Sequence, residues 1–163
     1  MKKLLLLAGL VLAAGVMGWL PATQKDVGSL VPVETLVLTV EDQTLVVRGD
    51  GDVEGRGGTW AAAMDDLRAT TPGDAFFGAT GHVIFVGRAV TALPDVLRDK
   101  ALRPAARVYV ALEEPEPESA TEFLGAHPAG VTLQDLQAAA LEGRSVELPR
   151  LEYQDGRYHL YYE

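Results

Sequence analysis

The sequence predicts an α/β protein, with α+β as the alternative. We expect a mixed sheet that has a hairpin at each end and a helix-strand-helix-strand crossover unit in its centre. Residues 59–113 alternate between helical patterns and short apolar runs. Two apolar strands joined by a connection that contains a helix are typical of parallel pairing. The runs at 34–48 and 145–162 are β-rich and flank this unit, which predicts the two hairpins.

The first hairpin is predicted from a β-branched, leucine-rich pattern. Residues 35–40 form the centre of its first strand, Glu41-Asp42-Gln43 supply the turn, and residues 44–48 form the return strand. The glycine-rich stretch 49–58 follows, and we expect it to be a mobile connection into a helix.

Calcium and phosphate are the two candidate ligands for that glycine-rich stretch. Asp50, Asp52 and Glu54 resemble the first half of a calcium loop, but Ala61 occupies the position of the closing glutamate. The glycine spacing also matches no phosphate-binding loop, and the acidic side chains would repel a phosphate. The sequence therefore favours neither calcium nor phosphate here.

The central unit begins with a helix over 59–70, capped by Thr59, whose apolar stripe consists of Trp60, Met64 and Leu67. Residues 82–86 are predicted to form a strand buried on both faces. A second helix over 91–103 and a second strand over 107–112 follow. The expected stripe of this second helix comprises Val90, Leu93, Val96 and Leu97, with Pro94 in its first turn.

The C-terminal third begins with an acidic, proline-broken linker over 113–118. A short helix over 119–124, capped by Ser119, and another over 132–141 are expected next. The apolar residues of the latter are Leu133, Leu136, Ala140 and Leu141. Residues 145–153 and 157–162 alternate around Gln154-Asp155-Gly156, which predicts the second hairpin. Its tyrosines, at 153, 158, 161 and 162, are expected to cover a sheet face or edge, with an exposed aromatic patch as the alternative.

The N-terminus has the pattern of a targeting segment. Lys2 and Lys3 precede an uncharged, almost wholly apolar run over 4–20. We therefore expect residues 1–22 to be a signal peptide or an N-terminal membrane anchor, and residues 23–163 to be a single α/β domain. The lysines predict that the domain lies outside the cytoplasm, secreted if the leader is cleaved.

Composition excludes several classes of function. The net charge of −9 argues against nucleic acid as a partner, because a phosphate backbone would be repelled. The absence of cysteine excludes disulfides, thiolate metal sites, a cysteine nucleophile and a lipidated N-terminal cysteine.

The central stretch resembles the spore germinant-receptor C subunit family, the Ger(x)C-type lipoproteins of endospore-forming bacteria. The resemblance rests on Gly58-Thr59 opening an alanine-rich helix, on Phe76-Phe77-Gly78, on the segment 81–87, and on Val108-Tyr109-Val110-Ala111. Gly18 stands where the family carries its lipid-accepting cysteine, and the chain covers only the family's first domain. The resemblance implies a non-enzymatic protein that is associated with the cell or spore inner membrane and contacts the membrane proteins of a germinant-receptor complex.

No catalytic, cofactor-binding or metal-binding residues are predicted. His82, His127 and His159 lie in different elements, without metal-ligand spacing. The alternative function is a secreted small-ligand-binding module or a hydrolase, whose site would form around Asp74 and His82.

Overall fold

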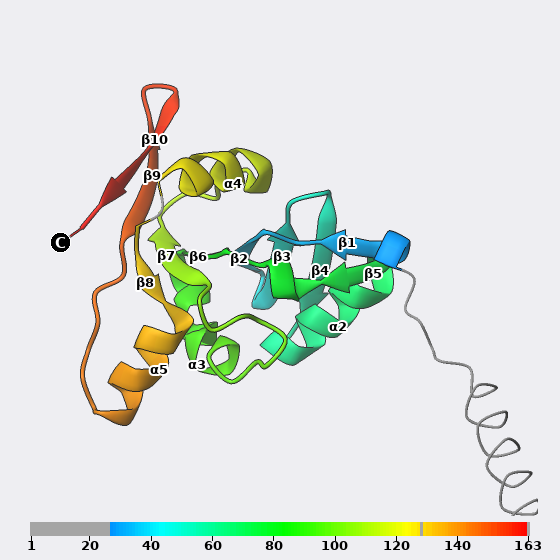
Figure 1. Ribbon diagram of the computed structural model, residues 1–163, viewed down its shortest axis with the longest axis horizontal. Helices are drawn as coiled ribbons and strands as arrows, with labels where there is room; N and C mark the ends of the chain where they lie inside the picture. Colours follow the sequence, from blue (N-terminus) through cyan, green and yellow to red (C-terminus); the bar gives the residue numbers. More distant parts are fainter. Residues whose placement is uncertain (1–26, 128, 163) are drawn as a thin grey trace, which may run out of the picture.

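The computed structural model describes residues 27–127 and 129–162 (Figure 1). A mixed sheet with the strand order β10-β9-β7-β6-β2-β3-β4 organises this part of the chain, and β8 pairs with β7 beside that path. The strands β2, β6, β7 and β9 are mutually parallel, whereas the outer strands pair antiparallel with their neighbours. The predicted class, a mixed sheet with a hairpin at each end, is confirmed.

The strands of the main sheet are β2 (Thr35–Glu41), β3 (Thr44–Gly49), β4 (Val53–Gly57), β6 (His82–Val86), β7 (Arg107–Ala111), β8 (Val131–Thr132), β9 (Arg150–Gln154) and β10 (Arg157–Tyr161). A separate pair consists of β1 (Leu30–Pro32) and β5 (Asp74–Phe76). The helices are α2 (Trp60–Thr70), α3 (Leu93–Val96), α4 (Pro117–Ala126) and α5 (Leu133–Leu141). Short 3₁₀ helices cover Val27–Ser29, Phe77–Ala79 and Gly87–Ala92.

Helices cover both faces of the sheet, with α4 on one side and α2, α3 and α5 on the other (Figure 1). The central strands alternate between two apolar clusters because successive side chains of a strand point to opposite faces. In β6, for example, Val83 and Phe85 pack toward α2, whereas Ile84 packs toward α4. Both faces of β6 are therefore buried, as its apolar run predicted.

The N-terminal hairpin is confirmed in position. Its turn is shorter than predicted, because Glu41 still belongs to β2 and pairs with Thr44, which leaves only Asp42 and Gln43, with positive φ angles of 44° and 68°, in the turn. The prediction of a mobile connection at 49–58 is wrong, because residues 53–57 form the strand β4. A Cβ atom on Gly55 would lie 2.2 Å from the carbonyl oxygen of Ala63 in α2. The glycine therefore allows the helix to pack directly on the strand.

In the central unit, α2, β6 and β7 lie where the sequence predicted them, and β6 and β7 are parallel. The α2 N-cap is Thr59, whose hydroxyl accepts from the Ala62 amide. The helix predicted over 91–103 is much shorter, since α3 ends at Val96. Asp99 explains part of this difference: its carboxylate accepts hydrogen bonds from the Ala101 amide and from Trp60 Nε1, which favours a turn over further helix. Val90, predicted to be in the stripe, is exposed.

In the C-terminal third, α4 begins at Pro117 with Glu116 as its N-cap, so the predicted cap at Ser119 is wrong. Pro117 starts the helix well because the first turn does not need its amide hydrogen. The helix α5 is confirmed and has a capping box formed by Thr132 and Asp135. Its buried face contains Ala139, whereas Ala140 is exposed and Leu141 is 90% exposed, contrary to prediction.

The second hairpin is confirmed around Asp155 and Gly156, although its first strand begins only at Arg150. The leader predicted over 1–22 lies outside the described residues. Within the residues described, none of the helices is long and apolar enough to cross a membrane.

Candidate functional site: an acidic pocket lined by tyrosines

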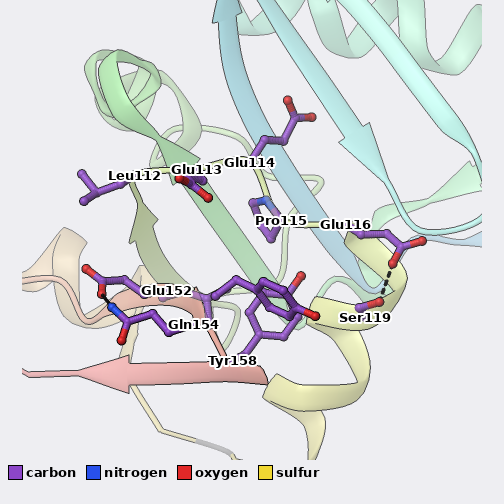
Figure 2. A pocket seen from close by; sticks show the side chains of 11 residues that line it. Leu112, Glu113, Glu114, Pro115, Glu116, Ser119, Glu152, Gln154 and Tyr158 are labelled. Carbon is purple, nitrogen blue, oxygen red and sulfur yellow. Dashed lines mark hydrogen bonds between the residues drawn. The ribbon is translucent and has the colours of Figure 1, made fainter. Parts of the chain in front are cut away.

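A pocket of about 670 Å³ lies beside the C-terminal hairpin, between strand β9 and the linker that follows β7. Figure 2 shows Glu152 and Gln154 on one side of it, Pro115 and Glu116 on another, and Tyr158 between them. The residues that line it are Leu112, Glu113, Glu114, Pro115, Glu116, Ser119, Leu151, Glu152, Tyr153, Gln154 and Tyr158. None of these is a lysine, an arginine or a histidine.

The pocket exists because two neighbouring strands have different lengths. The register of β7 and β9 ends at the pair Ala111 and Leu151. Beyond this point the chain leaves β7 as a proline-containing linker, while β9 continues to Gln154 with β10 as its partner. The side of β9 that faces away from β10 therefore borders the open space of the pocket.

Arg48 on β3 holds the linker in place. Its guanidinium donates to Glu114 in the linker, to Glu41 on β2 at 2.8 Å and to Glu54 on β4 at 2.7 Å. These contacts raise the pKa of Arg48 and, with the neighbouring Arg56, lower the pKa of Glu41 and Glu54. One wall of the pocket is thus fixed by a charge network that reaches across three strands.

Aromatic rings form the opposite wall and continue beneath α4. Tyr153 and Tyr158 lie directly opposite each other on β9 and β10, and their ring centroids are 5.0 Å apart in an edge-on arrangement. The ring of Tyr158 also contacts the ring of Phe123 in α4, with 5.6 Å between the ring centroids. Phe123 in turn stacks on the His127 ring, with 4.4 Å between the centroids. Tyr153 is 58% exposed, so the expectation that the tyrosines cover a face or edge describes Tyr158 better than Tyr153.

The pocket is electronegative. Glu113 is exposed and takes part in none of the ion pairs among the described residues, while Glu116 accepts a hydrogen bond from the Ser119 hydroxyl. Glu152 accepts from Gln154 and lies 2.7 Å from Arg150 Nε, which offsets part of its charge. Burial and the nearby Glu116 carboxylate raise the pKa of Tyr158, so this phenol stays neutral at physiological pH. Carboxylates beside aromatic faces attract ammonium and guanidinium groups.

The alternative site around Asp74 and His82 has a different environment. Asp74 belongs to β5 in the small sheet, whereas His82 begins β6 in the main sheet and is 8% exposed. Burial and the positive charges of Arg107 and Arg103 lower the pKa of His82 to about 4. Its Nδ1 lies 3.5 Å from the hydroxyl of Tyr109, which donates to the carbonyl of Ala129 at 2.6 Å. Neither His82 nor Asp74 lines the pocket described above.

Two of the acidic residues in the glycine-rich stretch 49–58, Asp50 and Glu54, have structural partners. Asp50 Oδ1 accepts from the backbone amides of Glu34 and Thr35 at 2.8 and 2.9 Å, and Glu54 pairs with Arg48 and Arg56. Across the described ranges, 27–127 and 129–162, no group of three or more histidine or acidic side chains could hold a metal ion.

The residues of the pocket belong to two separate elements of the sequence. The acidic run at 113–118 predicts a linker, and the tyrosines of the hairpin predict packing on a sheet face or edge, with an exposed aromatic patch as the alternative. Their common location depends on where β7 ends beside β9, which no local pattern encodes. The one sequence signal is that an acidic linker and a tyrosine-rich hairpin occur in the same chain.

Comparison with known proteins gives no relative. No family model matches the chain, and neither the curated proteins nor the solved structures include a significant match.

Proposed function

We propose that this protein is a non-enzymatic binding module that contacts another protein through the acidic pocket. The observation that supports the proposal best is the combination of Glu113, Glu116 and the exposed ring of Tyr153 around one open space. A lysine or arginine side chain of a partner would gain both a carboxylate and an aromatic face there. Linear segments with basic residues are recognised by acidic surfaces through this chemistry, and opposite charge also speeds their association.

The resemblance to germinant-receptor C subunits supports a setting for this contact. We propose that the domain acts at the outer face of a membrane in a spore-forming bacterium, either anchored through residues 1–22 or secreted after their cleavage. Its partners would be membrane proteins of a germinant-receptor type complex. An acidic domain would remain away from anionic lipid, so that a protein rather than the lipid surface is its binding target.

Photo-crosslinking in cells of the source bacterium tests this function. A photoreactive amino acid replaces Tyr153 at the pocket, and in a matched variant it replaces Lys100, an exposed residue that does not line the pocket. We expect position 153 to crosslink to a membrane protein of the receptor type, and position 100 not to do so. If both positions capture the same proteins with equal yield, or position 153 captures none, the proposed contact does not exist.

A small-ligand-binding module is the second candidate, and the volume of the pocket favours it. About 670 Å³ falls within the size range of small-molecule sites, roughly 300 to 1,000 Å³. The same carboxylates and tyrosines would select a cationic amine. Titration of the purified domain with a series of diamines and amino-acid amides, followed by tyrosine fluorescence, tests this candidate. Saturable binding that is lost in Glu113→Lys would support it, and no change in fluorescence would reject it.

A further inference from the structure

The main sheet ends at β4 on one side and at β10 on the other, and the two edges are treated differently. Side chains of α2 cover the edge of β4. The backbone amide of Arg56 donates to Asp66 Oδ2 at 2.8 Å, and the carbonyl of Glu54 accepts from the Thr70 hydroxyl at 2.7 Å. Two outward-facing backbone groups at this edge therefore have partners within the chain, which disfavours the addition of a further strand.

The β10 edge has no such cover. The β9–β10 hairpin turns through two residues, Asp155 and Gly156, and its register pairs Arg157 with Gln154. In a hairpin with a two-residue loop, this first pair is hydrogen bonded and the pairs alternate thereafter. The amides and carbonyls of Tyr158 and Leu160 therefore point away from β9. In the part of the chain that the structure describes, none of the backbone hydrogen bonds outside the strand ladders involves β10.

The sequence of β10 has few of the features that usually protect an edge strand. Its one fully charged side chain is Arg157 at its start, it contains neither proline nor lysine, its register with β9 is continuous from Arg157 to Tyr161, and it carries an apolar residue at Leu160. Exposed edges are commonly blocked by proline, lysine, a bulge or a covering helix. An unblocked edge at one end of a sheet whose other edge is blocked is available for pairing with an extended chain. Figure 1 shows this hairpin projecting from the body of the domain.

We propose that β10 binds an extended, basic segment of a partner protein as an additional strand of the sheet. Charge favours such a segment over a second copy of this chain. Each copy has a net charge of −9, so two copies would repel each other, whereas a basic segment would be attracted. Arg150 offsets the charge of Glu152 on the hairpin, and Arg157 of β10 is itself positive, so the local attraction for lysine or arginine comes from Glu113 and Glu116 of the pocket, which Tyr158 of β10 also lines.

This inference rests on the proposed function in one respect, since both require a protein partner. They differ in the contact: the pocket binds side chains, whereas the edge binds a backbone. A partner could use the pocket alone, and the experiment must therefore report on the two places separately.

Backbone hydrogen exchange of the domain, measured by nuclear magnetic resonance, distinguishes binding at the β10 edge from binding in the pocket. The probe is a peptide of about eight alternating lysines and valines, a length typical of a strand, and the matched control alternates glutamate and valine. We expect the lysine peptide to protect the amides of Tyr158 and Leu160 from exchange by about tenfold or more, because they become hydrogen bonded. The amides of His159 and Tyr161 already face β9 and should change little. The glutamate peptide should protect neither set.

Two variants complete the test. Leu160→Pro removes an outward amide and should abolish peptide binding, with circular dichroism used to verify that the variant is folded. In Glu113→Lys the pocket loses charge while the edge is intact, so Tyr158 and Leu160 should still be protected at a higher peptide concentration. Strand addition is overturned if the lysine peptide binds without protecting these two amides, if it does not bind at all, or if the domain protects them by dimerising in sedimentation experiments. The first of these results would leave the pocket proposal standing.

Discussion

The backbone amide of Arg56 in β4 donates a hydrogen bond of 2.8 Å to the carboxylate of Asp66 in α2. The two residues are only ten positions apart, yet their contact closes one edge of the main sheet. The Thr70 hydroxyl of α2 also donates a hydrogen bond to the carbonyl of Glu54 in β4. Through these two bonds α2 covers the edge of β4 in addition to one face of the sheet. The opposite edge, at β10, has no equivalent among the described residues, which gives the domain a blocked end and an open end.

Substituting Asp66 by alanine should therefore weaken the β4 edge. We expect a loss of about 1 kcal/mol in the free energy of unfolding, because an edge amide exchanges a carboxylate acceptor for water. The control is Asp65→Ala, since Asp65 is exposed and, among the described residues, forms an ion pair only with Arg68 of the same helix, so its effect should stay within about 0.5 kcal/mol. Urea unfolding followed by circular dichroism measures both. Equal stabilities for the two variants would show that the Arg56 contact does not stabilise the edge.

Replacing Gly55 by alanine should be much more damaging. The new Cβ would lie 2.2 Å from the Ala63 carbonyl oxygen and 2.4 Å from the Leu67 amide nitrogen, which are backbone atoms that cannot move without displacing α2. We expect a loss of about 3 kcal/mol or more, at the upper end for overpacked sites. Gly58→Ala is the matched variant, because its Cβ would meet nothing within 4 Å. Thermal unfolding should show a large decrease for the first variant only; similar midpoints would contradict the close packing.

Stability should decrease as the pH falls because of His82. Burial first, and then Arg107 and Arg103, lower its folded-state pKa from 6.5 to about 4. The unfolded chain therefore binds a proton at a higher pH than the folded protein does. The stabilisation is complete above pH 6.5 and is lost toward pH 4, and it amounts to about 2 kcal/mol between pH 7 and pH 5. Urea unfolding across this range should give a flatter profile for His82→Asn than for the wild type. Parallel profiles would contradict the lowered pKa.

Arg48 should control the order of the linker that forms one pocket wall. Arg48→Gln removes the charge that holds Glu114 against β2 and β4, so amide exchange in the linker should accelerate. Arg98→Gln is the control, because the Arg98 side chain is 77% exposed and its ion pair in the described part of the chain, with Asp95, lies away from the linker. Hydrogen exchange with mass spectrometry of peptides covering 112–116 measures the effect. Unchanged exchange in the Arg48 variant would mean that the linker is fixed by its prolines alone.

Elements that depend on local pattern were predicted well from the sequence. The helix α2 has a capping threonine and a regular stripe of Trp60, Met64 and Leu67, and all three side chains are buried. The strands β6 and β7 are short apolar runs that packing on both faces requires. In contrast, β4 was missed because Gly55 and Gly57 suggest a loop. These glycines in fact serve the approach of α2, and only the packed helix shows this.

The pocket could not be predicted, because it depends on contacts between distant parts of the chain. Arg48 and Glu114 are 66 residues apart, and nothing in either local sequence indicates that they meet. The wall of tyrosines similarly depends on the register that places Tyr153 opposite Tyr158 at the point where β7 has already ended. The sequence does indicate an acidic linker and a tyrosine-rich hairpin. It does not indicate that the two form one pocket, because this depends on β7 ending earlier than the neighbouring strand β9.

The most direct test of the account reverses the charge of the pocket and measures contact with the partner. Glu113→Lys and the control Glu142→Lys change the net charge equally, but Glu142 is the C-cap residue that follows α5 and does not line the pocket. Each is combined with the photoreactive residue at position 153, and the crosslinked partner protein is quantified by mass spectrometry in cells of the source organism. We predict a reduction of about fivefold or more for the Glu113 variant, because attraction becomes repulsion, and no change for the Glu142 variant. Equal crosslinking in both variants would contradict a basic partner in the acidic pocket.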